Sequence, residues 1–336
     1  MLMSAPSQPS IVDILSDAYA RLNRAAWIVA IPLVLNVALW YAPAVSFAPL
    51  LNQSAQLLRD MQPDDAPEST AEIRQIRDQT ITVLEELGSD DMRPQLAWLN
   101  AVPYTIYGFR AGGASADAVG LPFINAQPAK VDPATAIWVE GFGDVARSFL
   151  VVNVVGLFMT ALYLLLVAGS VRDSAPMDKF GGQLLLTMGR LLLYALTITA
   201  IAVVLLIPLS IFTFLLISLN PAFGAFVLLA GSAIWLWAGI YLGFTRELMV
   251  LNDYGPFQAI RASITLVRTS FWRVVSFVGV LLVVVAGMGI VLAGMIGTQA
   301  GLIGAIIVSA YLMSGISVAR MRFVQLHQGA PTVHIV

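Results

Sequence analysis

The sequence predicts an all-α polytopic membrane protein with six transmembrane helices, interfacial amphipathic helices and one mostly helical extracytoplasmic loop domain. Hydrophobic residues make up 58% of the 336 residues and charged residues only 11%, whereas soluble domains carry about 25% charged residues. Six long apolar stretches contain no Asp, Glu, Lys, Arg or His. Because lipid leaves every backbone polar group in need of an internal partner, runs of about 20 apolar residues are expected to form helices.

Span boundaries follow from length, since about 20 residues at 1.5 Å each cross the hydrocarbon layer. The stretches 191–245 and 274–319 are too long for single helices, and Asn220-Pro221 and Gly297 to Gly301 are the points at which they are expected to turn. The expected segments are an interfacial helix at 1–24, spans at 25–45, 148–169, 191–219, 222–245, 274–297 and 300–319, an extracytoplasmic domain at 46–147, cytoplasmic loops at 170–190 and 246–273, and a tail at 320–336.

The distribution of basic residues predicts the orientation. Seven of the 18 Lys and Arg residues lie in the 46–147 loop, and long loops contribute little to the positive-inside rule. We therefore expect both termini in the cytoplasm of a bacterial cell, with the chain in its inner membrane. The first apolar stretch exceeds the 7–15 residues of a signal-peptide core, so an uncleaved anchor is expected.

The outer loop contains one clear helical pattern. Ser69 to Glu72 reads as a capping box, and Gly88 is a candidate left-handed C-cap, which together predict a helix of about 19 residues. Its apolar stripe is either a partner-binding seam or a face that packs on its own domain. The stripe consists of Ile73, Ile76, Thr80, Val83 and Leu87.

Two segments ahead of spans share an amphipathic design typical of helices that lie on the membrane surface. One begins at Ile11 and the other at Phe257, and an offset of 245 residues aligns Leu15 with Ile260 and Trp27 with Trp272. A third, weaker copy is 178–194. The pattern indicates either internal duplication or a common requirement for Arg and Trp at this depth. The expected interfacial anchors are Arg21, Arg24, Trp27, Arg261, Arg268, Trp272 and Arg273.

Small and polar residues inside the spans are the remaining candidates for contacts. A repeat of small residues allows close helix packing, either within the chain or against a partner. The packing candidates are Gly239, Gly243, Gly289, Ala293, Gly297, Gly301, Ala305 and Ser309. Asn36 and Asn153 are expected to bond across helices to each other or to a nearby Thr. The possible polar lining of a path consists of Asn36, Asn153, Thr197, Thr199 and Thr213.

Several chemistries lack their usual residues. The two histidines, His327 and His334, lie in the tail, and the chain has no Cys. No catalytic residue, cofactor site or metal site is therefore predicted, and no nucleic-acid partner is expected. The spans contain no ionisable group that could couple transport to protons.

The segments before two spans carry a resemblance. Ile11-Val12-Asp13-Ile14-Leu15-Ser16-Asp17-Ala18 precedes the first span, and 259–263 with 268–273 precedes the fifth. They resemble a largely uncharacterised bacterial six-span family related to the membrane domain of some glycerophosphodiester phosphodiesterases. The resemblance covers the membrane part and implies a membrane module without phosphodiesterase chemistry, which needs a separate soluble domain.

Two functions remain open from the sequence. The first is a non-catalytic membrane scaffold or accessory subunit that contacts lipids and other membrane-protein subunits, or forms a homo-oligomer. The second is a permease or channel-like component for an apolar or amphiphilic solute. A continuous polar-lined cavity would favour the second function, and a packed interior would favour the first.

Overall fold

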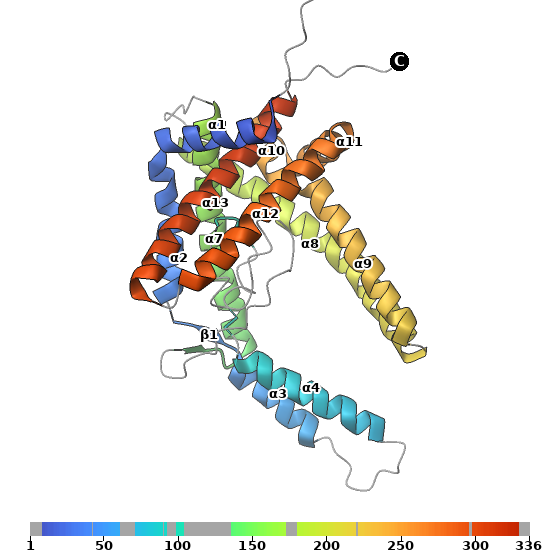
Figure 1. Cartoon of the computed structure of the whole chain (residues 1–336). Coiled ribbons are helices and arrows are strands. Elements are labelled where there is room, and N and C mark those ends of the chain that lie inside the picture. The colour runs from blue at the N-terminus through green and yellow to red at the C-terminus, as the bar shows by residue number, and fades with distance from the viewer. Residues whose placement is uncertain are drawn as a thin grey trace, which may run out of the picture.

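The computed structural model describes residues 9–41, 43–60, 71–89, 91–92, 99–103, 136–172, 180–219, 221–295 and 298–328. The described chain is almost entirely helical (Figure 1). The elements are α1 (Ile11–Arg24), the 3-10 turn η1 (Ala26–Val29), α2 (Ala30–Tyr41), β1 (Val45–Ser46), α3 (Ala48–Asp60), α4 (Ala71–Ser89), β2 (Ile137–Trp138), α7 (Phe142–Arg172), α8 (Phe180–Leu219), α9 (Pro221–Leu242), α10 (Thr245–Asn252), α11 (Pro256–Thr269), α12 (Phe271–Met295) and α13 (Gln299–Gln328).

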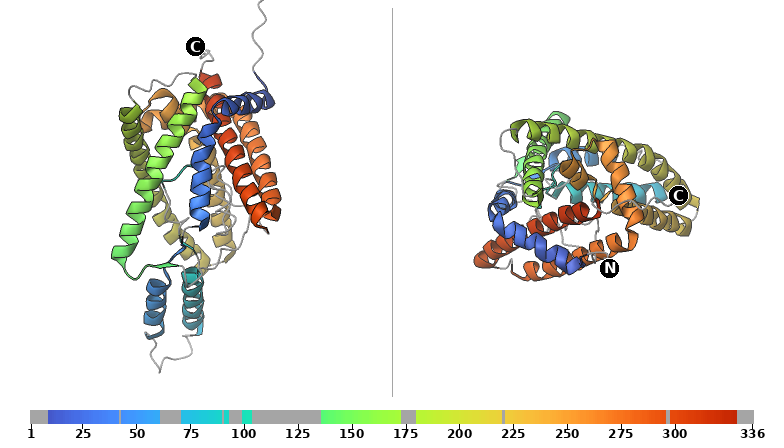
Figure 2. Two further views of the ribbon diagram at one scale, coloured as in Figure 1. Left: turned by 90° about the vertical axis from the view of Figure 1, so that its left-hand side faces the viewer. Right: turned by 90° about the horizontal axis from the view of Figure 1, so that it is seen from above.

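The membrane class is confirmed. Among the described residues, 5 helices are long and apolar enough to span a membrane, or 6 if the bent pair at the N-terminus counts as one span. In that pair α1 turns by 91° into η1 and α2, so α1 lies across the bundle end while α2 runs along it (Figure 2). β1 and β2 form only a short parallel pair.

Several predicted boundaries shift because helices extend beyond the apolar core of each span. α12 begins at Phe271, and α13 continues to Gln328, into the predicted tail 320–336. α7 begins at Phe142 and α8 already at Phe180, so the predicted loop 170–190 is much shorter than expected. Leu184, Met188 and Leu191 pack against the main core cluster, which explains why the first turns of α8 are ordered as helix. The break before α9 falls at Pro221, as predicted, with the proline in its first turn.

α1 and α11 are closely matched in backbone geometry. Each has 14 residues, and their N-caps, Ser10 (φ −69°, ψ 163°) and Gly255 (φ −70°, ψ 162°), are 245 residues apart. The residues that end them, Ala25 (φ −126°, ψ 42°) and Ser270 (φ −128°, ψ 33°), keep the same offset. Each helix then leads through this bend into an apolar segment. The match of both caps supports a duplicated elbow unit.

The third proposed elbow does not have this geometry. α8 runs as a single helix from Phe180 to Leu219, so the described part of 178–194 is the beginning of a long helix without a separating bend. The amphipathic pattern was therefore not sufficient to predict an elbow. α1 and α11 both end at a non-helical residue before the next segment, and α8 has no such residue in this region.

The core lies at the end of the bundle that carries the elbows. α13 contacts α1, α2, α7, α10 and α12, and an aromatic stack joins three elements there. Phe323 of α13 stacks on Phe277 of α12 with ring centroids 4.4 Å apart, and on Phe244 before α10 at 5.5 Å. This end of the molecule is thus the most firmly packed.

The small-residue candidates divide between packed and open positions. Ala305 is fully buried between α12 and α13 with Leu292 and Leu302, and Ser309 and Gly289 are also buried. Gly301 lies against the carbonyl of Met295, where a Cβ would be 1.9 Å from that oxygen. Gly297 and the side chain of Ala293 lie outside the described residues. For the described residues of this small-residue repeat, the close contacts are within the chain.

The pair Gly239 and Gly243 does not form the predicted packing face. Gly239 is exposed and nothing lies within 4 Å of the position a Cβ would take. Gly243 lies in the break between α9 and α10, and its carbonyl accepts a hydrogen bond from Arg320. The small-xxx-small spacing therefore corresponds to an open surface followed by a turn.

The outer helix α4 has the predicted length of 19 residues, but its buried face differs from the prediction. Ile81 and Gly88 are buried, while Val83 and Leu87 are 51% and 42% exposed. Gly88 is no left-handed cap: it lies within the helix, where a Cβ would be 3.1 Å from the Cα of Ala48 in α3. The stripe residues Thr80, Val83 and Leu87 are therefore not the face that packs on α3, and the side chains of Ile73 and Ile76 lie outside the described residues. Ser69 and Thr70 lie outside the described residues.

Candidate partner-binding surface

A short non-helical segment, Leu99–Pro103, lies between α2 and α7 and appears as the teal piece in Figure 2, left. Side chains of α7 bond its backbone. The amide of Leu99 donates to Asn153 Oδ1 at 2.9 Å, and the amide of Ala101 donates to Thr160 Oγ1 at 2.7 Å. The Thr160 hydroxyl in turn donates to the carbonyl of Leu99 at 3.1 Å. Irregular backbone at membrane depth requires such internal partners.

One face of α7 is shaped for this segment. Asn153, Gly156 and Thr160 are spaced three and four residues apart and therefore share a helix face. A Cβ at Gly156 would be 3.3 Å from the Cβ of Asn100, so the glycine permits the close approach. Val102 is fully buried in the main core cluster. The segment is thus an integral part of the bundle interior.

Asn36 of α2 holds the other end of the segment. Its Nδ2 donates to the carbonyl of Pro103 at 3.3 Å and to that of Pro32 at 2.8 Å. Its Oδ1 is buried without a hydrogen-bond partner among the described residues. One alternative was a hydrogen bond between Asn36 and Asn153, and the structure does not have it. Asn153 and Thr160 both bond the backbone of Leu99–Pro103, hereafter the inserted segment. The sequence did not single out Thr160.

The threonines proposed as polar lining lie apart from this cluster. Thr197 donates to the carbonyl of Leu193 at 2.8 Å, and Thr213 donates to that of Leu209 at 2.7 Å. Both hydroxyls are therefore satisfied within α8. Thr199 is half-buried on the same helix. The predicted polar set does not form a single lining, because α8 diverges from α2.

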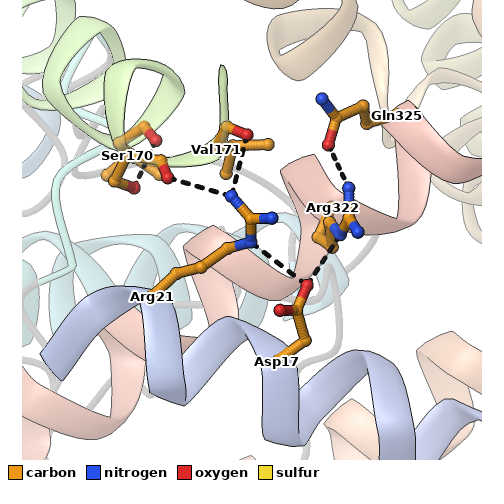
Figure 3. A network of polar contacts seen from close by, with 7 residues as sticks. Asp17, Arg21, Ser170, Val171, Arg322 and Gln325 are labelled. Atoms are coloured by element: carbon orange, nitrogen blue, oxygen red, sulfur yellow. Dashed lines mark hydrogen bonds and ion pairs between the residues drawn. The ribbon is translucent and has the colours of Figure 1, made fainter. Parts of the chain in front are cut away.

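A charged network fixes α1 to the bundle (Figure 3). Asp17 Oδ2 accepts from Arg21 Nε at 3.1 Å and from Arg322 Nε of α13 at 2.7 Å. Arg21 also donates to the carbonyl of Val171 at the end of α7, at 3.1 Å. Burial acts to raise the pKa of Asp17, but Arg21 and Arg322 outweigh it and lower the pKa overall. The network joins α1, α7 and α13.

A second set of ionic contacts fixes α10. Glu247 accepts from Arg320 Nε of α13 at 2.5 Å, and the Arg320 guanidinium lies 5.6 Å from the ring centroid of Phe244. Arg172 at the end of α7 donates to the carbonyls of Val250 and Leu251, which are C-terminal groups of α10. These contacts join residues 73 to 79 positions apart. Among the networked residues, Asp17 with Arg21 and Arg322 with Gln325 have local spacings that could have revealed them.

The predicted interfacial anchors are mostly exposed. Trp27 and Trp272, which are equivalent in the two elbows, both have large exposed fractions. Arg24, Arg261 and Arg268 are exposed as well, whereas Arg273 is half-buried beside His327. Arg21 instead serves the network of Figure 3. The elbow end thus presents indole rings and exposed guanidinium groups, as expected at a headgroup layer.

The α8–α9 hairpin carries a long exposed apolar surface. The most apolar stretch of α8 has no buried residue, and none of the α9 residues whose burial is described is buried. α9 packs mainly on α8 and α11, and the far ends of the two helices diverge from the rest of the bundle (Figure 1). The exposed aromatic side chains of the hairpin are Phe212, Phe223, Phe226, Trp235 and Trp237.

The α3–α4 hairpin projects from the other end of the molecule, opposite the elbows (Figure 1). The ion pair between Arg59 and Glu85 and the buried Ala55 and Ile81 hold its helices together. Val83 and Leu87 lie one turn apart on α4 and are exposed. An exposed apolar pair on a helix rich in acidic residues is a candidate contact surface.

Comparison with protein-family models, curated proteins and solved structures finds no match for this chain. Among the described residues, no group of three His, Cys, Asp or Glu side chains is placed to hold a metal ion.

Proposed function

We propose that this protein is a non-catalytic membrane scaffold, an accessory subunit that binds another membrane protein through the α8–α9 hairpin. In this proposal it resides in a bacterial inner membrane with both termini in the cytoplasm. The observation that carries the proposal is the exposed apolar surface of α8 and α9, whose far ends diverge from the bundle on which their near ends pack. The resemblance to a bacterial family of membrane modules points the same way.

The composition of the hairpin supports a protein partner rather than lipid alone. Aromatic side chains are enriched in protein interfaces because they bury a large area at low entropic cost, and five of them are exposed on α8 and α9. The exposed Val83 and Leu87 on the projecting α4 supply a second contact surface outside the apolar helices. Both surfaces lie away from the packed elbow end, so a partner can bind without disturbing the core.

Photo-crosslinking in native membranes tests this function. A crosslinking amino acid placed at Val204 of α8 or Leu229 of α9, which are 69% and 70% exposed, is expected to capture a discrete protein. The matched control is Ile303 of α13, also more than half exposed, which is expected to yield lipid adducts. If all three positions yield only lipid adducts, the scaffold proposal is wrong. Capture of a second copy would replace the accessory-subunit role by homo-oligomerisation.

The alternative of a permease for an amphiphilic solute is favoured by one observation, the buried and unpartnered Oδ1 of Asn36 beside the inserted segment. Such an oxygen can accept a hydrogen bond from a solute that displaces the segment Leu99–Pro103 from between α2 and α7. The expected result is flux of a fluorescent phospholipid across vesicles that contain the purified protein, reduced in Asn36→Leu. Vesicles with no flux above that of protein-free vesicles would exclude the alternative.

A further inference from the structure

A pocket of about 290 Å³ lies at the elbow end, where the start of α1, the start of α12 and the end of α13 meet. Its polar lining includes Ser10, Arg273 and His327, and its apolar lining includes Ile11, Ile14 and Phe323. The exposed Trp272 borders the same pocket. The pocket therefore combines basic groups with an apolar wall, and lies where the apolar part of α12 begins.

Two basic groups meet inside the pocket. The imidazole Nδ1 of His327 lies 2.8 Å from the carbonyl of Phe323, to which it donates. The Nε2 of a neutral His327 is then the acceptor that faces Arg273 Nη1 at 3.3 Å. Arg273 also donates to the carbonyl of Pro9 at 3.4 Å, and no carboxylate pairs with it among the described residues. A cationic pocket with hydrogen-bond donors and no acidic partner is suited to an anion.

An acidic group near the pocket, Asp13, bonds to Ser10 and not to Arg273. It accepts from the backbone amide of Ser10 at 2.9 Å and from its hydroxyl at 2.7 Å, so it closes the capping box of α1. Its carboxylate offsets the positive end of the α1 dipole, so the positive charge of the pocket comes from the guanidinium and, once protonated, from the imidazole.

We propose that this pocket binds the phosphate of an anionic glycerophospholipid headgroup. The phosphate oxygens accept hydrogen bonds from the Arg273 guanidinium and from protonated His327, while Ile11, Ile14 and Phe323 contact the glycerol and the upper acyl chain. The apolar wall is what selects a lipid over free phosphate. Burial and the neighbouring Arg273 lower the pKa of His327 below the ordinary imidazole value of 6.5, so binding strengthens as pH falls below about 6.5 and His327 gains its charge. The inference is independent of what the α8–α9 hairpin binds.

Native mass spectrometry of the purified full chain tests the site with three probes: phosphatidylglycerol, phosphatidylcholine and inorganic phosphate. Phosphatidylglycerol is expected to bind at least about tenfold more tightly than phosphatidylcholine, and phosphate is expected not to displace it. Arg273→Gln is expected to remove this preference. Arg268→Gln, which neutralises an exposed arginine on α11 that does not line the pocket, is expected to retain it.

Two further variants keep the test decisive if Arg273→Gln is unstable. Ser276→Phe fills the pocket without changing charge and is expected to abolish the preference. His327→Gln is expected to remove the pH dependence of phosphatidylglycerol binding while leaving binding at high pH unchanged. Equal losses in Arg268→Gln and Arg273→Gln would indicate general surface attraction and overturn the site. Displacement by phosphate alone would overturn the lipid assignment.

Discussion

Tyr19 of α1 packs on a glycine of α13, and this contact positions the helix. Its ring lies over Gly315 of α13, where a Cβ would be 2.1 Å from a ring carbon. Its hydroxyl donates to the carbonyl of Leu312 at 3.0 Å, and its ring lies 5.6 Å from that of Tyr311. Burial raises the pKa of Tyr19 to about 12, so the hydroxyl remains a donor at any physiological pH. α1 can lie flat on α13 only because position 315 has no side chain.

The variant Gly315→Ala is therefore expected to destabilise the protein. The added methyl group must displace the Tyr19 ring, and overpacking of this kind costs about 1–3 kcal/mol. Gly279→Ala is the matched control, because Gly279 lies in α12 with open space around it, and alanine is the better helix former by about 0.5–1 kcal/mol. Thermal unfolding in detergent should show opposite shifts. A higher unfolding temperature for both variants would contradict the contact.

Asp17 is expected to make stability depend on acid pH. Its pKa is lowered in the folded protein by Arg21 and Arg322, against the effect of burial. The stabilisation is therefore present above the ordinary pKa of about 3.9 and is lost as pH falls through the lower folded value. Asp17→Asn should unfold more easily than the unsubstituted protein at neutral pH, with the difference shrinking toward about pH 3. Asp144→Asn, at an exposed carboxylate at the start of α7, is the matched control for the removal of one negative charge.

At the scale of elements, the inserted segment depends on α7 for its hydrogen bonds. Thr160→Val keeps the shape of the side chain but leaves the amide of Ala101 and the carbonyl of Leu99 without their partner. Such a loss costs about 1–3 kcal/mol, so the segment is expected to leave its site more often. Because the chain has no Cys, Ala101→Cys provides a single thiol, and a membrane-permeant reagent should label it faster in the Thr160→Val background.

Thr197→Val is the control for the inserted segment, since the Thr197 hydroxyl bonds only within α8. It is expected to leave the labelling rate of Ala101→Cys unchanged. If Ala101→Cys is labelled at the same rate in the Thr160→Val and Thr197→Val backgrounds, the hydrogen bonds of α7 do not hold the segment.

The two elbows differ in their N-caps, and this difference can be tested. Ser10 Oγ accepts from the amide of Asp13 at 3.1 Å, whereas Gly255 has no side chain to cap α11. The backbone angles of the two residues match closely, so Gly255→Ser is expected to supply the missing acceptor. A gain of a few tenths of a kcal/mol is expected, because glycine is itself a tolerated cap. A lower unfolding temperature for this variant would show that the two caps are not equivalent.

Local patterns predicted those elements whose partners are local. The two elbows follow from apolar spacing within 14 residues each, and the break at Pro221 follows from proline chemistry. The partner of Asn153 lies 54 residues away and that of Asp17 on α13 lies 305 residues away. Such pairings depend on how helices assemble, so neither could be read from spacing. The same reason explains why the face of α4 that packs on α3 was not predicted, since α3 itself was not predicted.

At the scale of the whole molecule, the two ends are chemically different. The elbow end holds the ionic contacts of α1, α10 and α13 around an aromatic core. The opposite end carries the projecting α3–α4 hairpin (Figure 1). Between the ends run the apolar helices, with α8 and α9 diverging from the others. A packed elbow end and a projecting hairpin at the opposite end suit the proposed scaffold, which would contact partners on both sides of a membrane.

This arrangement predicts that α4 and α11 lie on opposite sides of the membrane. Gln79 of α4 and Thr265 of α11 are both exposed, and replacing either by Cys introduces the sole thiol of the chain. In intact spheroplasts a membrane-impermeant thiol reagent is expected to label Gln79→Cys and to spare Thr265→Cys, because the elbows carry the arginines that the positive-inside rule places in the cytoplasm. Permeabilised spheroplasts should label both, which controls for access. The reverse labelling pattern would mean that the orientation is inverted. Labelling of both variants in intact spheroplasts would place α4 and α11 on the same side, which contradicts an odd number of membrane crossings between them.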